Sequence, residues 1–260
     1  MGAAQQDLYR WHSENFRAVS TGFERTCSIL TLALGDRDEV AVDALTRVAT
    51  FLLSAKVESR FYKLLYEPPV PDEFRALVNA KAGRAPSLID KWKRTVEIAF
   101  CEYNHVNRPF QDSVAPLDSK RQHDVHLSGI KHLESIIGLR NKVAHGQWRV
   151  ALNTSGTDLN AGITARLSAE NLMSLQLKDR LAASVANAVN DLVVSSKTHH
   201  RDLGVHRSAT EDAIRELETR SWEKYVANVV NRADIRRERA KAVRTRLKRL
   251  QADGQSKADV

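Results

Sequence analysis

Apolar residues recur at spacings of three and four along most of the chain, which is the pattern of amphipathic α-helices. Before residue 146 this pattern predicts helices at about 3–34, 38–66, 87–104 and 120–145. All six prolines lie before residue 117, so the predicted breaks between helices are concentrated in the first half of the chain. The sequence therefore predicts an all-α fold.

The pattern changes after Gly146. Residues 147–153 and 162–167 alternate apolar and polar positions on either side of a Thr-Ser-Gly-Thr-Asp turn, which predicts a short β-hairpin. Ser168 is the expected N-cap of the next helix, which should run to about His199. Its predicted buried stripe consists of Leu172, Leu175, Leu181, Val185, Ala188 and Leu192.

The last part of the chain begins with an expected loop around Gly204. Residues 209–250 contain no proline or glycine, so they are predicted to form one long or broken helix that ends in a disordered tail. We expect a main helical domain over 1–204, with 38–200 as its core, and a C-terminal extension over 205–260. A chain of 260 residues is long enough to bury a sizeable core.

The net charge of +8 is concentrated in the extension. Residues 231–250 contain nine Lys or Arg against two acidic residues, a net charge of +7. Such a segment attracts phosphate backbones without sequence preference, and the candidate nucleic-acid-binding residues are Arg236, Arg237, Arg244 and Lys248. The alternative is a solvated helix whose charges serve only solubility.

The run Gly138–Gly146 is the strongest candidate for chemistry, because it places Arg140, Asn141 and His145 on the last turns of one predicted helix. Asn141 and His145 are four residues apart and share a face. Arg140 lies about 140° from His145 around the helix and must curl its side chain back. Gly146 favours a left-handed helix stop, where the helix dipole favours a protonated imidazole that could exchange protons near neutral pH.

Two other pairs have the same arginine-to-histidine spacing. Arg121 and His126 form one pair, but the residue after the arginine is Gln122. Arg201 and His206 form the other across Gly204, an unfavourable residue for a helix interior. Neither pair ends at a glycine, so the sequence favours Arg140 and His145.

Glu58 lies on the predicted apolar stripe of the 38–66 helix, between Ala55 and Tyr62. A buried carboxylate needs a cationic or hydrogen-bonding partner. Arg140 is the candidate partner, so that Glu58 would support and aim the guanidinium. The alternatives are a structural ion pair with Arg60 or another arginine, or an edge position that reaches water.

No metal or cofactor site is expected. His123, Asp124 and His126 have ligand-like spacing, but the chain offers no further ligands to complete such a site. Cys27 and Cys101 are far apart and are predicted to be buried thiols. No stretch approaches the roughly 18 apolar residues of a membrane span, and no secretory signal is apparent, so a cytoplasmic location is expected.

The segment from Arg140 to His145 resembles the R-x4-6-H motif of the HEPN superfamily, and Asn141 fits the polar residue that follows its arginine. The resemblance implies a helical bundle that dimerises and cleaves RNA without metal, by attack of the 2′-OH, in toxin, antiphage or RNA-processing systems. The implied partners are RNA, a second copy of the chain and an antitoxin or other regulatory protein. Gln147 and Trp148 replace a tyrosine found in the common toxin branch, two residues after the histidine.

In this interpretation His145 transfers protons, Arg140 stabilises the phosphate, and Asn141 orients the imidazole or the phosphate. A different class of function is also open. The chain could be a non-catalytic helical module that binds RNA, DNA or an acidic protein through its basic C-terminal helix, with Arg140 and Glu58 structural and His145 only closing a helix.

Overall fold

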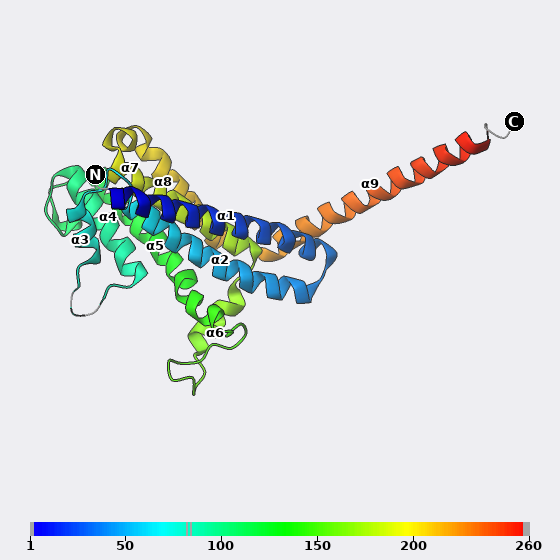
Figure 1. Ribbon diagram of the computed structural model, residues 1–260, viewed down its shortest axis with the longest axis horizontal. Coiled ribbons are helices and arrows are strands. Elements are labelled where there is room, and N and C mark those ends of the chain that lie inside the picture. Colours follow the sequence, from blue (N-terminus) through cyan, green and yellow to red (C-terminus); the bar gives the residue numbers. More distant parts are fainter. Residues whose placement is uncertain (1–2, 82, 84, 257–260) are drawn as a thin grey trace.

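The computed structural model describes residues 3–81, 83 and 85–256, and these residues form nine α-helices and one short 3-10 helix (Figure 1). The all-α prediction is confirmed. The first two helices, α1 (Ala3–Asp36) and α2 (Glu39–Leu65), run side by side in opposite directions. Asp38 caps α2 by accepting a hydrogen bond from the N–H of Ala41 at 3.0 Å.

The proline-rich region between α2 and the motif helix holds three further elements. A short helix, α3 (Asp72–Asn79), was not predicted. Helix α4 (Leu88–Asn104) starts at a capping box formed by Ser87 and Asp90, and a 3-10 turn (Phe110–Asp112) follows it. Helix α5 (Leu117–Ala144) then carries the motif, so the helices expected at 87–104 and 120–145 are confirmed.

The predicted β-hairpin is wrong. The described residues contain no β-strand, and the only pairing is one antiparallel bridge between Leu152 and Leu159. The expected second strand is a helix, α6 (Ala161–Ala169), which Asn160 caps by accepting a hydrogen bond from Ile163 N–H. The alternating pattern misled because its apolar residues Ile163 and Leu167 are also four apart, and so share one face of a helix.

The helix after α6 begins later than expected. Its N-cap is Asn171 and not Ser168, because Asn171 and Ser174 form a capping box. Helix α7 (Leu172–Val194) buries every residue of its predicted stripe. The loop expected around Gly204 is also absent, since α8 (Ser196–Thr219) runs through it. Packing of α8 against α5 and α7 outweighs the cost of one helical glycine, which is about 1 kcal/mol.

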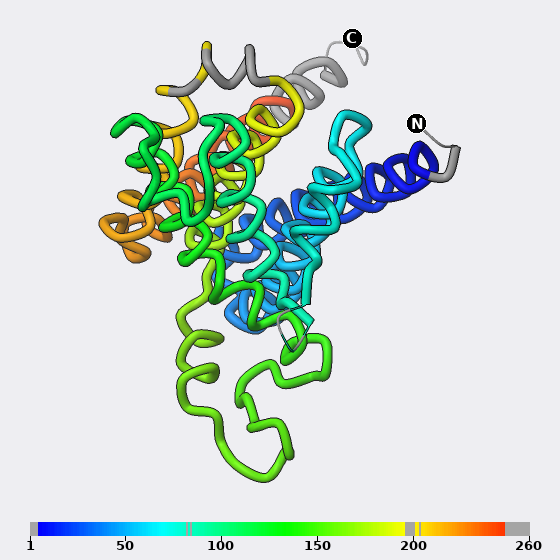
Figure 2. The backbone as a smooth tube through the Cα atoms, turned by 90° about the vertical axis from the view of Figure 1, so that its left-hand side faces the viewer, coloured from blue at the N-terminus to red at the C-terminus, as the bar shows by residue number. Residues whose placement is uncertain are grey.

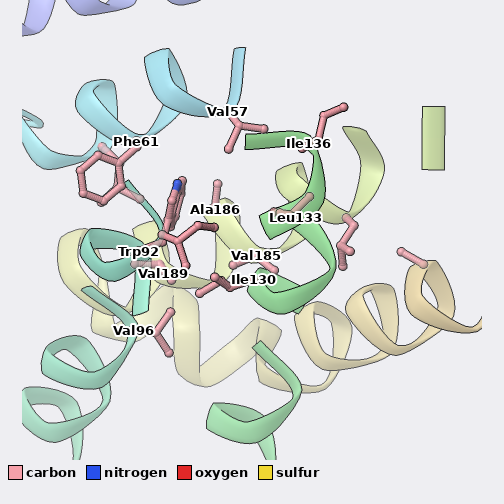
Figure 3. Packing of buried hydrophobic residues seen from close by; sticks show 14 of the residues in the cluster. Val57, Phe61, Trp92, Val96, Ile130, Leu133, Ile136, Val185, Ala186 and Val189 are labelled. Atoms are coloured by element: carbon pink, nitrogen blue, oxygen red, sulfur yellow. The ribbon is translucent and has the colours of Figure 1, made fainter. Parts of the chain in front are cut away.

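The main core lies where α2, α4, α5 and α7 meet (Figure 3). Phe61 of α2 contacts Trp92 of α4 edge-on, with ring centroids 5.0 Å apart. At Gly129 the helices α5 and α7 approach so closely that an added Cβ would lie 2.9 Å from Val185. Figure 3 shows Ile130, Leu133 and Ile136 of α5 directed into the same core.

The long C-terminal helix, α9 (Trp222–Ser256), has two unlike halves. Its first half packs along α1, where an added Cβ at Gly35 would lie 2.8 Å from Ala233. Its second half projects away from the bundle (Figure 1). The expected disordered tail is helical to Ser256, and residues 257–260 lie outside the described part of the chain. No described helix combines the length and the apolar content that crossing a membrane requires.

Candidate functional site

Helix α5 ends in a Schellman motif centred on Gly146, whose φ of +74° is left-handed. The N–H of Gly146 donates to the carbonyl of Val143 at 3.1 Å, and the N–H of Gln147 donates to that of Lys142 at 2.9 Å. His145 is the C-cap residue. The predicted glycine stop is confirmed, and it fixes where the imidazole leaves the helix.

Trp148 closes the end of the helix. Its indole Nε1–H donates to the carbonyl of Val143 at 3.0 Å, and Lys142 Nζ donates to the carbonyl of Leu152 at 2.6 Å. These two bonds hold the segment after the helix against its last turn. Trp148 as a whole remains 38% exposed.

A second, small core lies under the motif. Leu139 and Val143 point from α5 toward α6 and the preceding loop, where they contact Ala151, Leu167 and Ile163. Because Leu139 and Val143 share one face of α5, the motif residues lie on its other faces. Asn141 and His145 are exposed, and Arg140 is half-buried. Figure 2 shows how far the segment 147–169 extends from the bundle.

Arg140 forms an ion pair with Glu58 of α2. The predicted pairing of these two residues is therefore present, but the predicted core position of Glu58 is wrong. The buried face of α2 carries Val57 and Phe61, each one residue before an expected stripe position, because α2 packs against α1 as well as α5 and α7. Glu58 lies at the edge of this face with 29% of its side chain exposed.

The ion pair leaves the guanidinium able to bind a second anion. A guanidinium carries five N–H donors, and one carboxylate engages two of them at most in a bidentate pair. The Arg140 side chain is 37% exposed, so solvent or a ligand can reach it. Among the described residues, no hydrogen bond links Arg140 to His145.

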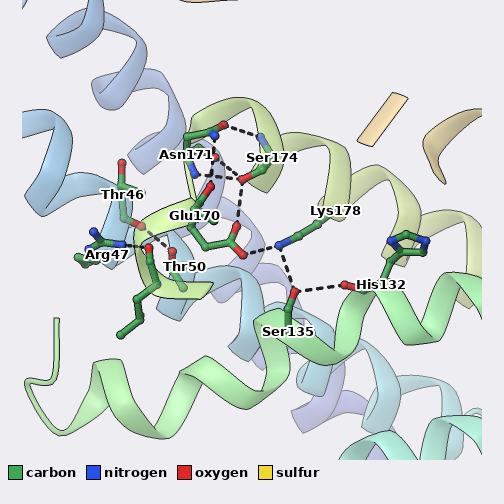
Figure 4. Close-up of polar contacts among 11 residues, drawn as sticks. Thr46, Arg47, Thr50, His132, Ser135, Glu170, Asn171, Ser174 and Lys178 are labelled. Carbon is green, nitrogen blue, oxygen red and sulfur yellow. Dashed lines mark hydrogen bonds and ion pairs between the residues drawn. The ribbon is translucent and has the colours of Figure 1, made fainter. Parts of the chain in front are cut away.

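A buried polar network fixes the middle of α5 and was not predicted from the sequence (Figure 4). Glu170, just before α7, pairs with Lys178 of α7 and accepts a hydrogen bond from Ser174 at 2.9 Å. Lys178 also donates to Ser135 of α5 at 3.1 Å. The only signal in the sequence was an acidic and a basic residue eight positions apart, next to the leucines of the predicted stripe.

Arg47 of α2 supports α6 in a similar way. Its buried guanidinium donates to the carbonyl of Leu167 and to Asp43, the latter at 3.1 Å. Arg149, in the loop after the motif, reaches the same carboxylate at 3.3 Å. The segment that follows the motif is therefore tied to α2 as well as to α5.

The two other arginine-histidine pairs lie in different surroundings. His126 is fully buried in the bundle. Arg201 and His206 lie on one continuous helix, contrary to expectation, but His206 bonds Asp191 at 2.7 Å and Arg201 bonds Asp202. Of the three matches, only Arg140 and His145 combine an exposed histidine with an arginine supported by another helix.

Of the side chains considered as metal ligands, the two histidines are buried and the aspartate is exposed. His123 Nε2 lies 2.8 Å from a carboxylate oxygen of Glu97, and His126 Nδ1 lies 3.5 Å from the hydroxyl of Thr210. Asp124 lies on the exposed side of α5. Cys27 and Cys101 are buried free thiols, as predicted, and burial raises the pKa of each to about 11.

The four candidate nucleic-acid-binding residues do not share one environment. Arg237 donates to the carbonyl of Gly35 at 2.7 Å and pairs with Asp36 and Asp234, and these carboxylates raise its pKa. Arg236 and Arg244 are exposed. Lys248 lies in the projecting half of α9, with its side chain outside the described part. Arg237 thus fastens α9 to α1.

Comparison of the chain with protein-family models, with curated proteins and with solved structures found no match.

Proposed function

We propose that this protein is a metal-independent endoribonuclease of the HEPN type. The observation that supports the proposal most is the pairing of Glu58 with Arg140, five residues before an exposed histidine at the end of the same helix. The carboxylate restricts the guanidinium, and the Schellman motif restricts the backbone of His145. A phosphate that binds Arg140 would meet the imidazole of His145 at the end of the same helix.

The proposed reaction is a transesterification. A base takes the proton of the 2′-OH, the 2′ oxygen attacks phosphorus, and the bond to the 5′ oxygen breaks as an acid protonates that oxygen. The products are a 2′,3′-cyclic phosphate and a 5′-hydroxyl. Arg140 stabilises the charge that develops on the phosphoryl oxygens, and Asn141 orients the phosphate or the imidazole.

One imidazole cannot act as base and acid in the same concerted step. Two copies of the chain related by a two-fold axis would supply two histidines to one cleft. In this proposal His145 of one protomer takes the proton and the partner's His145 donates one. Dimerisation is then part of catalysis, and a toxin, antiphage or RNA-processing role would involve RNA together with an antitoxin or another regulatory protein.

The test is cleavage of varied RNAs by the purified protein in buffer with EDTA. His145→Asn should reduce cleavage by about 10²- to 10⁴-fold, the usual contribution of general acid-base catalysis. His105→Asn is the matched control, because His105 is also an exposed C-cap histidine, at the end of α4. Wild-type protein that cleaves no RNA, or a His145→Asn variant that cleaves normally, would refute the proposal.

A non-catalytic binding module is the second candidate function. The observation that favours it is the projecting, basic second half of α9, which no described part of the bundle covers. This candidate predicts RNA or protein binding that is independent of His145, with no cleavage.

A further inference from the structure

Helix α9 divides its arginines between two faces. At about 100° per residue, Arg232, Arg236 and Arg239 fall within about 60° of one another, and Arg237 lies about 140° from Arg232. The face with Arg237 packs on α1 and is neutralised by Asp36 and Asp234. Helix α9 therefore contacts α1 through one arginine and presents the three others on a different face.

These three arginines line a groove of about 600 Å³ between α9, α1 and α7. Arg220, in the turn before α9, lines the same groove and shares Glu216 with Arg180. Arg232, Arg236 and Arg239 are exposed, and within the described residues none of them pairs with a carboxylate. The groove therefore has a strongly positive wall.

The rest of the groove suits a nucleotide chain. Tyr225 lines it. Its hydroxyl donates to Gln176 Oε1 at 3.0 Å, and its ring stacks with that of Trp222 with centroids 5.6 Å apart, so the orientation of the ring is fixed. Bases stack on such rings in proteins that bind single strands. Asn228 adds an exposed amide. The three arginines follow one another along α9 at rises of about 6 and 4.5 Å, so they can contact successive phosphates of one strand.

We infer that this groove binds the backbone of single-stranded RNA, with Arg232, Arg236 and Arg239 on the phosphates. The inference rests on the proposed function for the identity of the ligand and adds where the RNA is held. It also changes which residues are expected to bind RNA. Arg237 is used in the contact between α9 and α1, and Arg232 and Arg239 replace it. The apolar lining residue Val229 also packs against the core.

The test measures binding of an unstructured RNA of about 16 nucleotides to full-length His145→Ala protein, which keeps the RNA intact. The triple variant Arg232→Gln, Arg236→Gln, Arg239→Gln should weaken binding at least tenfold at physiological salt. Its plot of log K against log salt should be flatter by about 2, since each single-strand phosphate contact contributes about 0.7 to the slope.

A triple variant of Arg17, Arg121 and Lys131 to Gln removes the same charge from exposed positions outside the groove, and should leave the salt slope unchanged. An equal loss in this control would show that only net charge matters and would overturn the inference. An equal loss on changing Lys241, Arg244 and Arg246 to Gln would move the site to the projecting half of α9 and also overturn it.

The two proposals fail separately. Protein that binds RNA through the three arginines but cleaves none would refute the ribonuclease proposal and leave the RNA-binding groove supported. Normal RNA cleavage, with unchanged affinity in the Arg232, Arg236 and Arg239 variant, would refute the RNA-binding groove and leave the ribonuclease proposal supported. Circular dichroism of each variant checks that α9 is still folded.

Discussion

The end of α5 and the groove beside α9 both present arginine to solvent, but they do so in opposite ways. Arg140 is single, is held by Glu58 from another helix, and lies five residues before His145. Arg232, Arg236 and Arg239 form a row with no carboxylate partner in the described residues. A carboxylate partner neutralises part of the charge of an arginine and restricts the orientation of its guanidinium. The first arrangement suits a site that must position a phosphate, and the second suits one that must attract it.

The largest expected difference between the two sites is their response to lysine. Lysine keeps the charge but loses the planar fork of donors. Arg140→Lys should lower kcat by about 10²- to 10³-fold, because a transition-state contact is lost. Lysine at 232, 236 and 239 should weaken RNA binding by less than about threefold. Arg121→Lys, at the same spacing before a histidine, is the control for kcat. If both sites tolerate lysine equally, the comparison is wrong.

A smaller effect is expected from Glu58→Gln. Without the carboxylate the guanidinium is less restricted, so kcat should fall by about tenfold while KM stays within about twofold. Unfolding free energy should fall by about 1 kcal/mol or less, because the pair is partly exposed.

Asp179→Asn is the matched control for Glu58. Asp179 pairs with Lys56 of α2 at 2.8 Å, so it also joins two helices and is similarly exposed. A comparable loss of stability with unchanged kcat is expected. If Asp179→Asn lowers kcat as much as Glu58→Gln, then Glu58 acts only through the stability of the bundle.

The smallest effect concerns the two glycines of the motif helix. Gly146→Ala should destabilise the protein by about 1 kcal/mol, because alanine is strained at a φ of +74°. Gly138→Ala should stabilise it by about 0.5–1 kcal/mol, since Gly138 is helical and nothing lies within 4 Å of an added Cβ. Urea denaturation of both variants measures the difference. Shifts of the same sign would mean that the Schellman turn does not hold the site.

The sequence was sufficient to locate the helices for which apolar periodicity and the local breaks indicate the same bounds. Apolar periodicity located α1, α2, α4 and α5, and Gly146 marked the end of α5. It failed where one pattern fits two structures, as at Ile163 and Leu167 in α6. It also failed at Gly204, where contacts from α5 and α7 decide the outcome and no local signal reports them.

The candidate site was predictable in part for the same reason. The motif and its glycine stop are local, and the partner of Arg140 was expected from a carboxylate among apolar residues. The groove was not predictable, because Gln176, Arg220 and Arg232 come from different elements that meet only in the folded chain. The function of Arg237 was hidden as well, since Asp36 is about 200 residues away in the sequence.

The small core of Leu139, Val143, Ala151 and Leu167 is separate from the main one. Four buried side chains stabilise their region far less than the main bundle, so residues 147–169 should open locally long before the whole chain unfolds. Amide protons there should exchange with deuterium early. Gentle heating should then abolish RNA cleavage while the circular dichroism signal of the helices is unchanged. Loss of activity alone would therefore not show that the protein has unfolded.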